Sequence, residues 1–222
     1  MTNMLCESAF FGVVISLLAY ELGMLLKKKF GLPLFNPLLI SIAVVIVFLA
    51  VFDIDYQNYN DGAKYLSYLL TPATVCLAIP LYEQMEALKK NIKAILAGIL
   101  SGVLTSLTVV LALALIFNLN HKMYVTLLPK SITTAIGMAV TITVAVIIIT
   151  GVLGNMLAET LCKLFHIEEP IAKGISIGSA SHAIGTAKAM EMGDVEGAMS
   201  SLSIAVAGIL TVVGASIYAM FI

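Results

Sequence analysis

The chain has 222 residues, of which 60% are hydrophobic and 11% are charged, and its mean hydropathy is +1.05. Soluble domains carry about 25% charged residues, so this composition leaves too few ionic groups for a water-facing surface. The 12 basic and 13 acidic residues give no basic field, which excludes nucleic acid as a partner. The three cysteines are widely spaced and lack metal-ligand spacing, so we expect no metal and no cofactor.

The apolar runs are continuous rather than alternating, which predicts membrane-spanning helices and not barrel strands. Polar stretches at Asp53–Lys64 and Asn118–Lys122 separate some of them. We therefore expect an all-α fold, a polytopic helical bundle forming one transmembrane domain over residues 1–222. In chain order the runs are Ala9–Leu26, Pro37–Phe52, Tyr65–Tyr82, Ala94–Phe117, the hydroxyl-rich Leu127–Thr143, Val144–Leu164, Ile171–Met190 and Leu202–Ile222.

Basic residues between the runs predict the orientation. By the positive-inside rule, the lysines in 27–29 and 89–93 face the cytoplasm. One crossing per run would then put Lys163 and Lys173 on the wrong side. The conflict disappears if one apolar stretch, for which we favour Pro129–Val140, dips into the membrane and returns.

A short internal echo favours a repeat, in which a broken small-residue segment precedes a smooth aliphatic helix. Inverted repeats whose interrupted helices meet near the middle of the membrane are typical of secondary transporters. We expect repeats over residues 1–117 and 121–222, with broken or re-entrant helices. The echoed pairs are Thr71–Thr74 with Ala97–Leu100, and Ser179–Ser181 with Ala207–Leu210.

The first polar interruption combines Thr71 and Thr74 with Pro72 and Pro80. Proline removes a helical N–H donor, and free backbone groups are tolerated at membrane depth only where protein or water satisfies them. A kinked helix and a substrate-lining break explain this segment equally well.

The second interruption places Lys130 beside the hydroxyls of Ser131, Thr133 and Thr134, directly after Pro129. A cation, hydroxyl donors and a helix start together suit an anion. In the alternative interpretation, Lys130 extends to lipid headgroups and Ser131 caps a helix.

The third interruption, Gly178–Lys188, contains Ser181, His182, Thr186 and Lys188 among Gly and Ala. An ionisable residue at membrane depth is a functional candidate because its insertion costs a few kcal/mol. His182 could bind a carboxylate or carry a coupled proton, or it could only bond a neighbouring helix. Lys188 lies six residues further on, so a chain break near Gly185 is needed for the two side chains to converge.

Four segments closely resemble the LrgB/CidB family: Asn36–Leu39, Thr71–Tyr82, Leu128–Thr134 and Gly178–Lys188. The resemblance covers nearly the whole chain and implies a multi-pass protein of the bacterial inner membrane. Family members are often encoded beside a small holin-like partner of the LrgA/CidA type. The family was first described as modulating murein hydrolase activity and lysis. Related plastid glycolate/glycerate carriers and bacterial pyruvate-uptake systems point to transport of small monocarboxylates.

Two positions depart from the family pattern. Ala135 replaces a Pro that usually follows the paired Thr, which puts a helix break there in doubt. The polar, Gly-containing loop that usually comes next is missing between Ala139 and Thr143. Its loss would join two helices and change the number of membrane crossings.

From the residues and the resemblance we expect a carrier of small monocarboxylates such as pyruvate, glycolate or glycerate, coupled to protons, and not an enzyme. The alternative is an antiholin-like regulator of murein hydrolase activity and autolysis that acts with an LrgA/CidA-type partner. We also expect contact with membrane lipid and a homo-oligomer. The expected substrate-binding residues are Lys130, Ser131, Thr133, Thr134, Ser181, His182, Thr186 and Lys188, with Thr71 and Thr74 lining the opposing broken segment.

Overall fold

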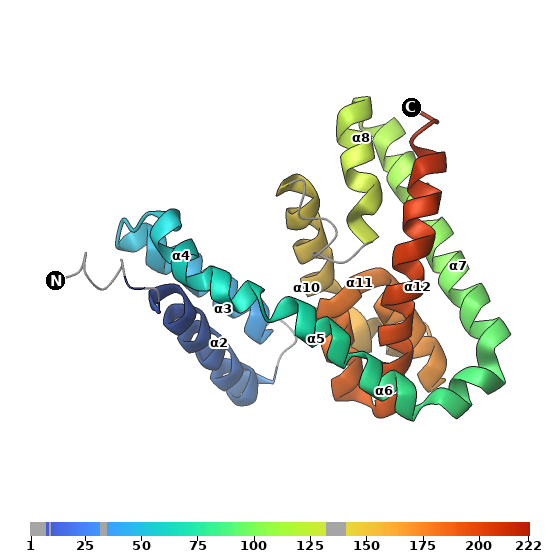
Figure 1. The fold of residues 1–222 in the computed structure, drawn as a ribbon, viewed down its shortest axis with the longest axis horizontal. Coiled ribbons are helices and arrows are strands. Elements are labelled where there is room, and N and C mark those ends of the chain that lie inside the picture. The colour runs from blue at the N-terminus through green and yellow to red at the C-terminus, as the bar shows by residue number, and fades with distance from the viewer. Residues whose placement is uncertain (1–7, 9, 32–34, 132–140) are drawn as a thin grey trace. The chain divides into compact units, whose positions relative to one another are not determined.

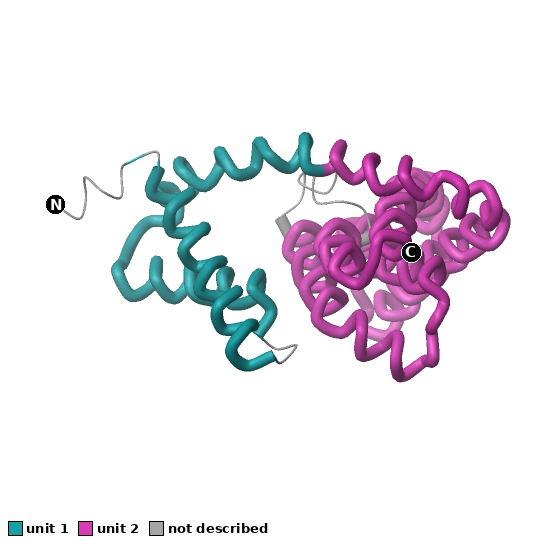
Figure 2. The backbone as a smooth tube through the Cα atoms, turned by 90° about the horizontal axis from the view of Figure 1, so that it is seen from below, with its two compact units in different colours: residues 1–73 teal, residues 74–222 magenta. Residues whose placement is uncertain are grey.

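The computed structural model describes residues 8, 10–31, 35–131 and 141–222. It divides into two compact units, residues 1–73 and 74–222 (Figure 2). Throughout the described ranges the regular structure is helical and no strand occurs. The predicted all-α helical bundle is confirmed, whereas the predicted repeats stay a prediction.

The first unit is built on α2 (Phe11–Phe30), which packs against α3 (Pro37–Val51) and α4 (Tyr56–Ser67). Helix α4 covers most of Asp53–Lys64, the polar stretch that we expected to separate two apolar runs. It is a helix because the Asp55 carboxylate accepts a hydrogen bond from the Gln57 N–H and so caps its first turn. Ser16 on α2 hydrogen-bonds Tyr59 on α4 at 2.7 Å.

The segment with two prolines is broken into two short helices, α5 (Leu70–Cys76) and α6 (Ala78–Glu83). Pro72 and Pro80 each occupy the third position of their helix. Proline is tolerated in the first turn of a helix because that N–H has no partner within the helix. The prolines therefore account for the separation into two helices.

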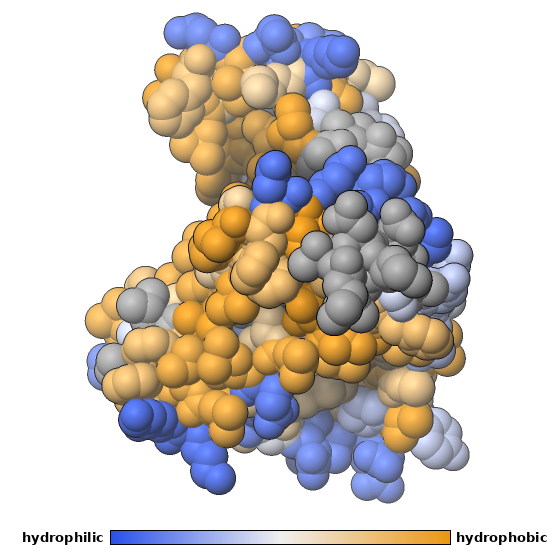
Figure 3. Space-filling model, turned by 90° about the vertical axis from the view of Figure 1, so that its left-hand side faces the viewer, coloured by the Kyte–Doolittle hydropathy of each residue, from blue (hydrophilic) through white to orange (hydrophobic). Residues whose placement is uncertain are grey.

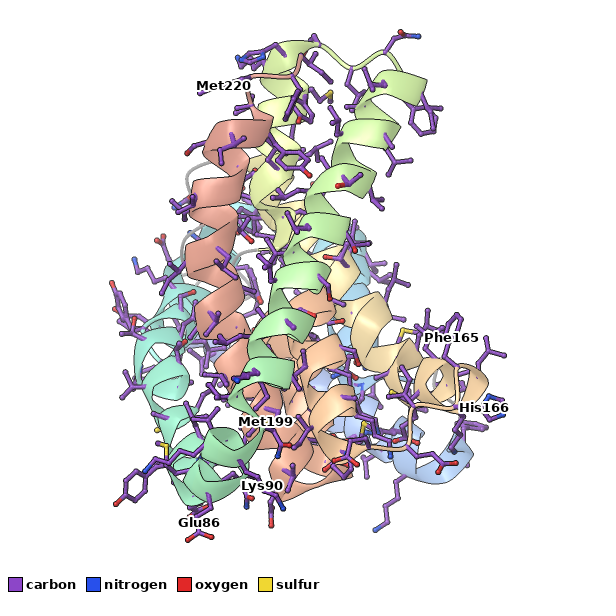
Figure 4. All side chains as sticks on the ribbon, turned by 90° about the vertical axis from the view of Figure 1, so that its right-hand side faces the viewer. Glu86, Lys90, Phe165, His166, Met199 and Met220 are labelled. Atoms are coloured by element: carbon purple, nitrogen blue, oxygen red, sulfur yellow. The ribbon has the colours of Figure 1, made fainter. Side chains whose placement is uncertain are left out.

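The second unit is built around two long helices, α7 (Met85–Ile116) and α12 (Asp194–Tyr218), which lie side by side (Figure 1). Thr108 hydrogen-bonds Tyr218 at 2.9 Å, and a Cβ on Gly214 would lie 2.5 Å from a Leu107 methyl. Both helices run in the same direction, since Lys90 and Met199 lie toward one end of the unit and Met220 at the other (Figure 4).

Helix α8 (His121–Leu127) and the 3₁₀ turn η1 (Leu128–Ser131) return antiparallel to α12. His121 Nδ1 bonds the carbonyl of Ile222, and the Tyr124 hydroxyl donates to the carbonyl of Tyr218 at 2.8 Å. Helix α10 (Thr141–Leu164) then runs back to the other end. Because α10 already begins at Thr141, no polar loop separates Thr141 from the aliphatic run that follows.

Helix α11 (Pro170–Met192) is a hairpin of two arms rather than one straight helix. His182 interrupts it with φ 48° and ψ −142°. A straight helix would separate Ile177 from Ala189 by about 18 Å, yet both belong to one packed cluster with Ala158. A Cβ on Gly185 would also lie only 3.1 Å from Ile177 Cγ2. The chain therefore reverses at residue 182, and residues 170 and 192 lie at the same end.

The direction of α10 bears on the predicted orientation. Helix α10 runs opposite to α7, so Lys163 at its end and Lys173 at the start of α11 lie at the end where α7 begins with its lysines. The predicted dip at Pro129–Val140 stays a prediction, because only residues 129–131 of that stretch are described. The positive-inside rule predicts that the end with these lysines is cytoplasmic.

Within the described residues, four helical stretches are long and apolar enough to cross a membrane: Tyr56–Glu83, Met85–Ile116, Ile142–Leu164 and Asp194–Tyr218. Large hydrophobic side chains such as Leu96, Leu100 and Leu104 on α7 are exposed. Figure 3 shows one face of the molecule, on which hydrophobic residues cover most of the surface. Such a surface requires lipid or protein around it, because large exposed apolar patches are rare on soluble monomers.

Candidate functional site

The tip of the α11 hairpin places His182 inside the second unit. Its side chain is only 4% exposed, and its Nε2 atom has no hydrogen-bond partner. Its backbone lies at positive φ, a region in which a non-glycine residue costs about 1–3 kcal/mol of strain. A strained backbone and an unsatisfied buried nitrogen at one residue are both destabilising, so the surrounding structure must hold this residue in place.

The 3₁₀ turn η1 carries Lys130 to the hairpin tip. This turn contacts α10, α11 and α12. The His182 ring is hydrogen-bonded to the backbone of Lys130 and lies within electrostatic range of its ammonium. Lys130 is half-buried and makes no ion pair with any residue that the structure describes. The two cationic candidates that sequence reasoning put first are thus brought together from segments about 50 residues apart.

The second arm of the hairpin is anchored to α12 through Thr186. Its hydroxyl bonds the carbonyl of His182 at 2.9 Å and the Ser200 hydroxyl at 2.7 Å. Both Thr186 and Ser200 are fully buried. The bond to His182 lies within the first turn of the second arm, and the bond to Ser200 connects this arm to α12.

Helix α10 supports the hairpin from another side. The Asn155 amide donates to the carbonyl of Ile184 at 2.7 Å. A Cβ on Gly154 would lie 1.7 Å from Ser181 Oγ, so glycine is needed where Ser181 approaches. Ser181 is buried at the end of the first arm, directly before His182. Close contact between helices at small residues is the usual packing of membrane helices.

Lys188 does not lie with Lys130 and His182 at the tip. Its ammonium pairs with Glu159 of α10 and with Glu191 at 3.2 Å, toward the end of the second arm. The reversal at His182 carries Lys188 away from the tip, so the break does not make the two side chains converge.

The remaining predicted residues have less structural support. Thr71 belongs to the first unit, and Thr74, on α5 in the second unit, is exposed. Ser131 ends η1. Thr133 and Thr134 lie outside the described residues.

Comparison with known proteins identifies the family. Residues 16–221 match the model of the LrgB-like family. The chain is also 39% identical to the antiholin-like protein LrgB of Bacillus mycoides and to that of Bacillus cereus, over 96% of each chain. The chain belongs to the LrgB-like family. It is therefore a multi-pass bacterial membrane protein, and no solved structure matches it.

In this LrgB-like protein the site has the chemistry of an anion receptor. The second hairpin arm starts at the tip, and the first N–H groups of a helix have no partners within it and carry partial positive charge. The Lys130 ammonium lies within electrostatic range of His182, whose Nε2 has no hydrogen-bond partner. These groups could bind a carboxylate and share one proton with it.

Sequence reasoning missed two of the supporting residues, Asn155 and Ser200. Each is a single polar residue in an otherwise apolar or small-residue stretch, with no motif around it. The available signal was the cost of placing such a side chain in lipid, which predicts that it bonds to another part of the protein.

Proposed function

We propose that this protein is a membrane carrier of small monocarboxylates of the pyruvate, glycolate or glycerate class, coupled to a proton, and not an enzyme. The observation that carries the proposal is the buried His182 with an unpartnered Nε2, positioned beside Lys130. A carboxylate supplies both the acceptor and the negative charge that this pair lacks. An anion bound there would also neutralise Lys130, which is expensive to leave charged at membrane depth.

Each residue has a distinct role in this proposal. Lys130 attracts the carboxylate by charge, and His182 donates to it when protonated and accepts when neutral. Thr186 holds the turn through its bond to the His182 carbonyl. Lys188 is left out of the binding group because two carboxylates already neutralise it.

Alternating access follows from the two elements that carry the site. The polypeptide enters the α11 hairpin from the end that we expect to be cytoplasmic, and it enters η1 from the opposite end through α8. Discontinuous helices that meet at a central site and move against each other are the usual route of alternating access. A ligand that bridges Lys130 and His182 would couple its own movement to theirs.

An antiholin-like regulator is the second candidate, because the relatives carry that name. The partner would be a holin-like protein of the LrgA/CidA type. A groove of about 580 Å³ between α7 and α11, lined in part by Gly98, Gly102 and Ser179, would suit a helix of that partner. This function does not require an unpartnered His182, which is why we rank it second.

Uptake by purified protein in liposomes tests the proposal. We expect labelled pyruvate or glycolate to enter without any partner protein, and to enter faster when the outside is made acidic. His182→Ala should abolish uptake while the protein remains folded and inserted. Flux or lysis that occurs only when the holin-like partner is added would favour the regulator instead.

A further inference from the structure

A cavity of about 240 Å³ lies beside the loop that joins α10 to α11. Its walls come from the end of α10, from this loop and from both ends of α11, so it shares no lining residue with the site at the hairpin tip. Figure 4 shows Phe165 and His166 on the loop, toward the end of the unit at which Lys90 lies. The positive-inside rule predicts that this end is cytoplasmic. The cavity therefore lies at the expected cytoplasmic boundary of the membrane.

Three basic side chains line this cavity: Lys163 of α10, His166 of the loop and Lys173 of α11. Neither lysine makes an ion pair with any residue that the structure describes. Lys173 is also half-buried. Like charges that line one cavity repel each other, and an anion between them removes this repulsion.

Two nearby carboxylates are compensated by other groups. Glu159 lines the cavity, but it forms an ion pair with Lys188. Glu196 lies within electrostatic range of the lining residue Cys162. Its carboxylate folds back to Gly193 at the start of α12, where the free N–H groups of a helix stabilise negative charge. Neither carboxylate therefore neutralises the two lysines.

Glu168 is the remaining acidic group on the described lining, and it makes no ion pair there. Two lysines contribute +2 and Glu168 contributes −1, which leaves +1 when His166 is neutral. A phosphodiester carries the opposite charge of −1. The cavity therefore matches a phosphodiester in charge, and it offers one carboxylate to accept hydrogen bonds from hydroxyl groups next to the phosphate.

His166 occupies a backbone position that usually selects glycine. Its φ is 52°, and beside it the Ile167 N–H bonds the Cys162 carbonyl at 2.8 Å. This is the left-handed turn that commonly ends a helix, and glycine is its usual residue because it has no Cβ. An imidazole at this position costs stability, and strained residues of this kind cluster at binding sites.

The surface of α10 next to the cavity favours a lipid over a soluble anion. Leu153, Leu157, Leu161 and Leu164 recur at spacings of three and four residues, which places them on one face of the helix, and all four are exposed. This leucine stripe ends beside Lys163 in the sequence. A volume of about 240 Å³ corresponds to about eight water molecules. It holds a phosphate-containing headgroup, whereas acyl chains need the leucine stripe outside.

We propose that this cavity binds the headgroup of an anionic phospholipid that carries hydroxyl groups, of which phosphatidylglycerol is the simplest. Lys163 and Lys173 donate to the phosphate oxygens, His166 adds a third donor, and Glu168 accepts from the glycerol hydroxyls. Basic pockets between membrane helices on the cytoplasmic side bind lipid headgroups in this way. The bound lipid connects α10 to the start of α11. Free phosphate shares the same chemistry, so the experiment must distinguish the two sources.

The test compares the double variant Lys163→Gln, Lys173→Gln with a matched control, Lys89→Gln, Lys90→Gln. The control removes the same charge from exposed positions at the same end of the unit. Protein in detergent is titrated with phosphatidylglycerol, with phosphatidylcholine, or with inorganic phosphate at constant ionic strength, and the melting temperature is recorded. We expect only phosphatidylglycerol to raise the melting temperature of the wild type. The cavity variant should bind it at least about tenfold more weakly, because charge-assisted hydrogen bonds are lost. The control should change by less than about threefold.

His166→Gly supplies a second measurement in a variant that folds readily. Glycine adopts positive φ freely, so this variant should melt above the wild type without lipid and gain less from phosphatidylglycerol. Equal losses in the two lysine pairs, an equal response to phosphatidylcholine, or no response to either lipid would overturn the inference. Stabilisation by inorganic phosphate in place of the lipid would assign the cavity to a free anion and would also overturn it. None of these measurements uses transport, so their outcome is independent of the proposed carrier function.

Discussion

Replacing His182 by glycine and by alanine separates the strain of the hairpin tip from its chemistry. Both substitutions remove the imidazole and its bond to the Lys130 backbone. They differ in the backbone, because glycine adopts positive φ freely whereas alanine does not. The structure places residue 182 at φ 48°, where a non-glycine residue costs about 1–3 kcal/mol. Glycine also loses about 0.4–1 kcal/mol more entropy than alanine on folding.

The balance of these two effects makes His182→Gly more stable than His182→Ala by about 0–2 kcal/mol. For a chain of this size, 1 kcal/mol corresponds to about 2–4 °C in melting temperature. We therefore expect the glycine variant to melt several degrees above the alanine variant in detergent. The matched control is Ala180→Gly, since residue 180 lies in the regular first arm. There glycine should lower the melting temperature.

Uptake gives the second half of this prediction. Neither variant at residue 182 should transport glycolate, although the glycine variant is well folded. If the alanine variant melts higher, the backbone is not in the left-handed region and the hairpin turn is placed wrongly. If both variants transport in proportion to the folded fraction, His182 is only a structural residue.

Three other substitutions distinguish the roles assigned above. Lys130→Met should lower carboxylate uptake about 10- to 100-fold without destabilising the fold, because it removes a charge-assisted bond; normal uptake would exclude Lys130 from the site. Thr186→Val should leave the Ser200 hydroxyl without a partner and reduce stability by about 1–3 kcal/mol, read as a lower melting temperature. Lys188→Met should change uptake less than about fivefold, as expected for a partly exposed ion pair; complete loss would return Lys188 to the binding group.

The fold class could be predicted because it follows from composition and hydrophobic patterning. The hairpin could not, because Ile171–Met190 has the length and polarity of a spanning helix. The chain reverses at His182, and histidine rarely adopts positive φ. No neighbouring proline or Asn-Gly pair signals a turn in the sequence. The requirement for a break near Gly185 was the one signal of it.

Two residues of the candidate site could be singled out from the sequence on physical grounds. Lys130 and His182 are expensive in lipid, so the sequence alone marks them as residues that must be satisfied by protein or ligand. Their mutual contact depends on where two distant segments end, which sequence periodicity does not encode.

The arrangement of unsatisfied groups favours a carrier over a helix-packing regulator. A protein whose task is to dock against a partner gains stability by pairing its buried polar groups, and a strained turn would serve no purpose there. Here the Nε2 atom of His182 has no hydrogen-bond partner, and the ammonium of Lys130 makes no ion pair with any described residue. A small carboxylic acid would supply a negative charge and hydrogen-bond acceptors to both groups at once. In the proposed carrier, the interactions that these groups do not make in the empty site would contribute to the free energy of carboxylate binding.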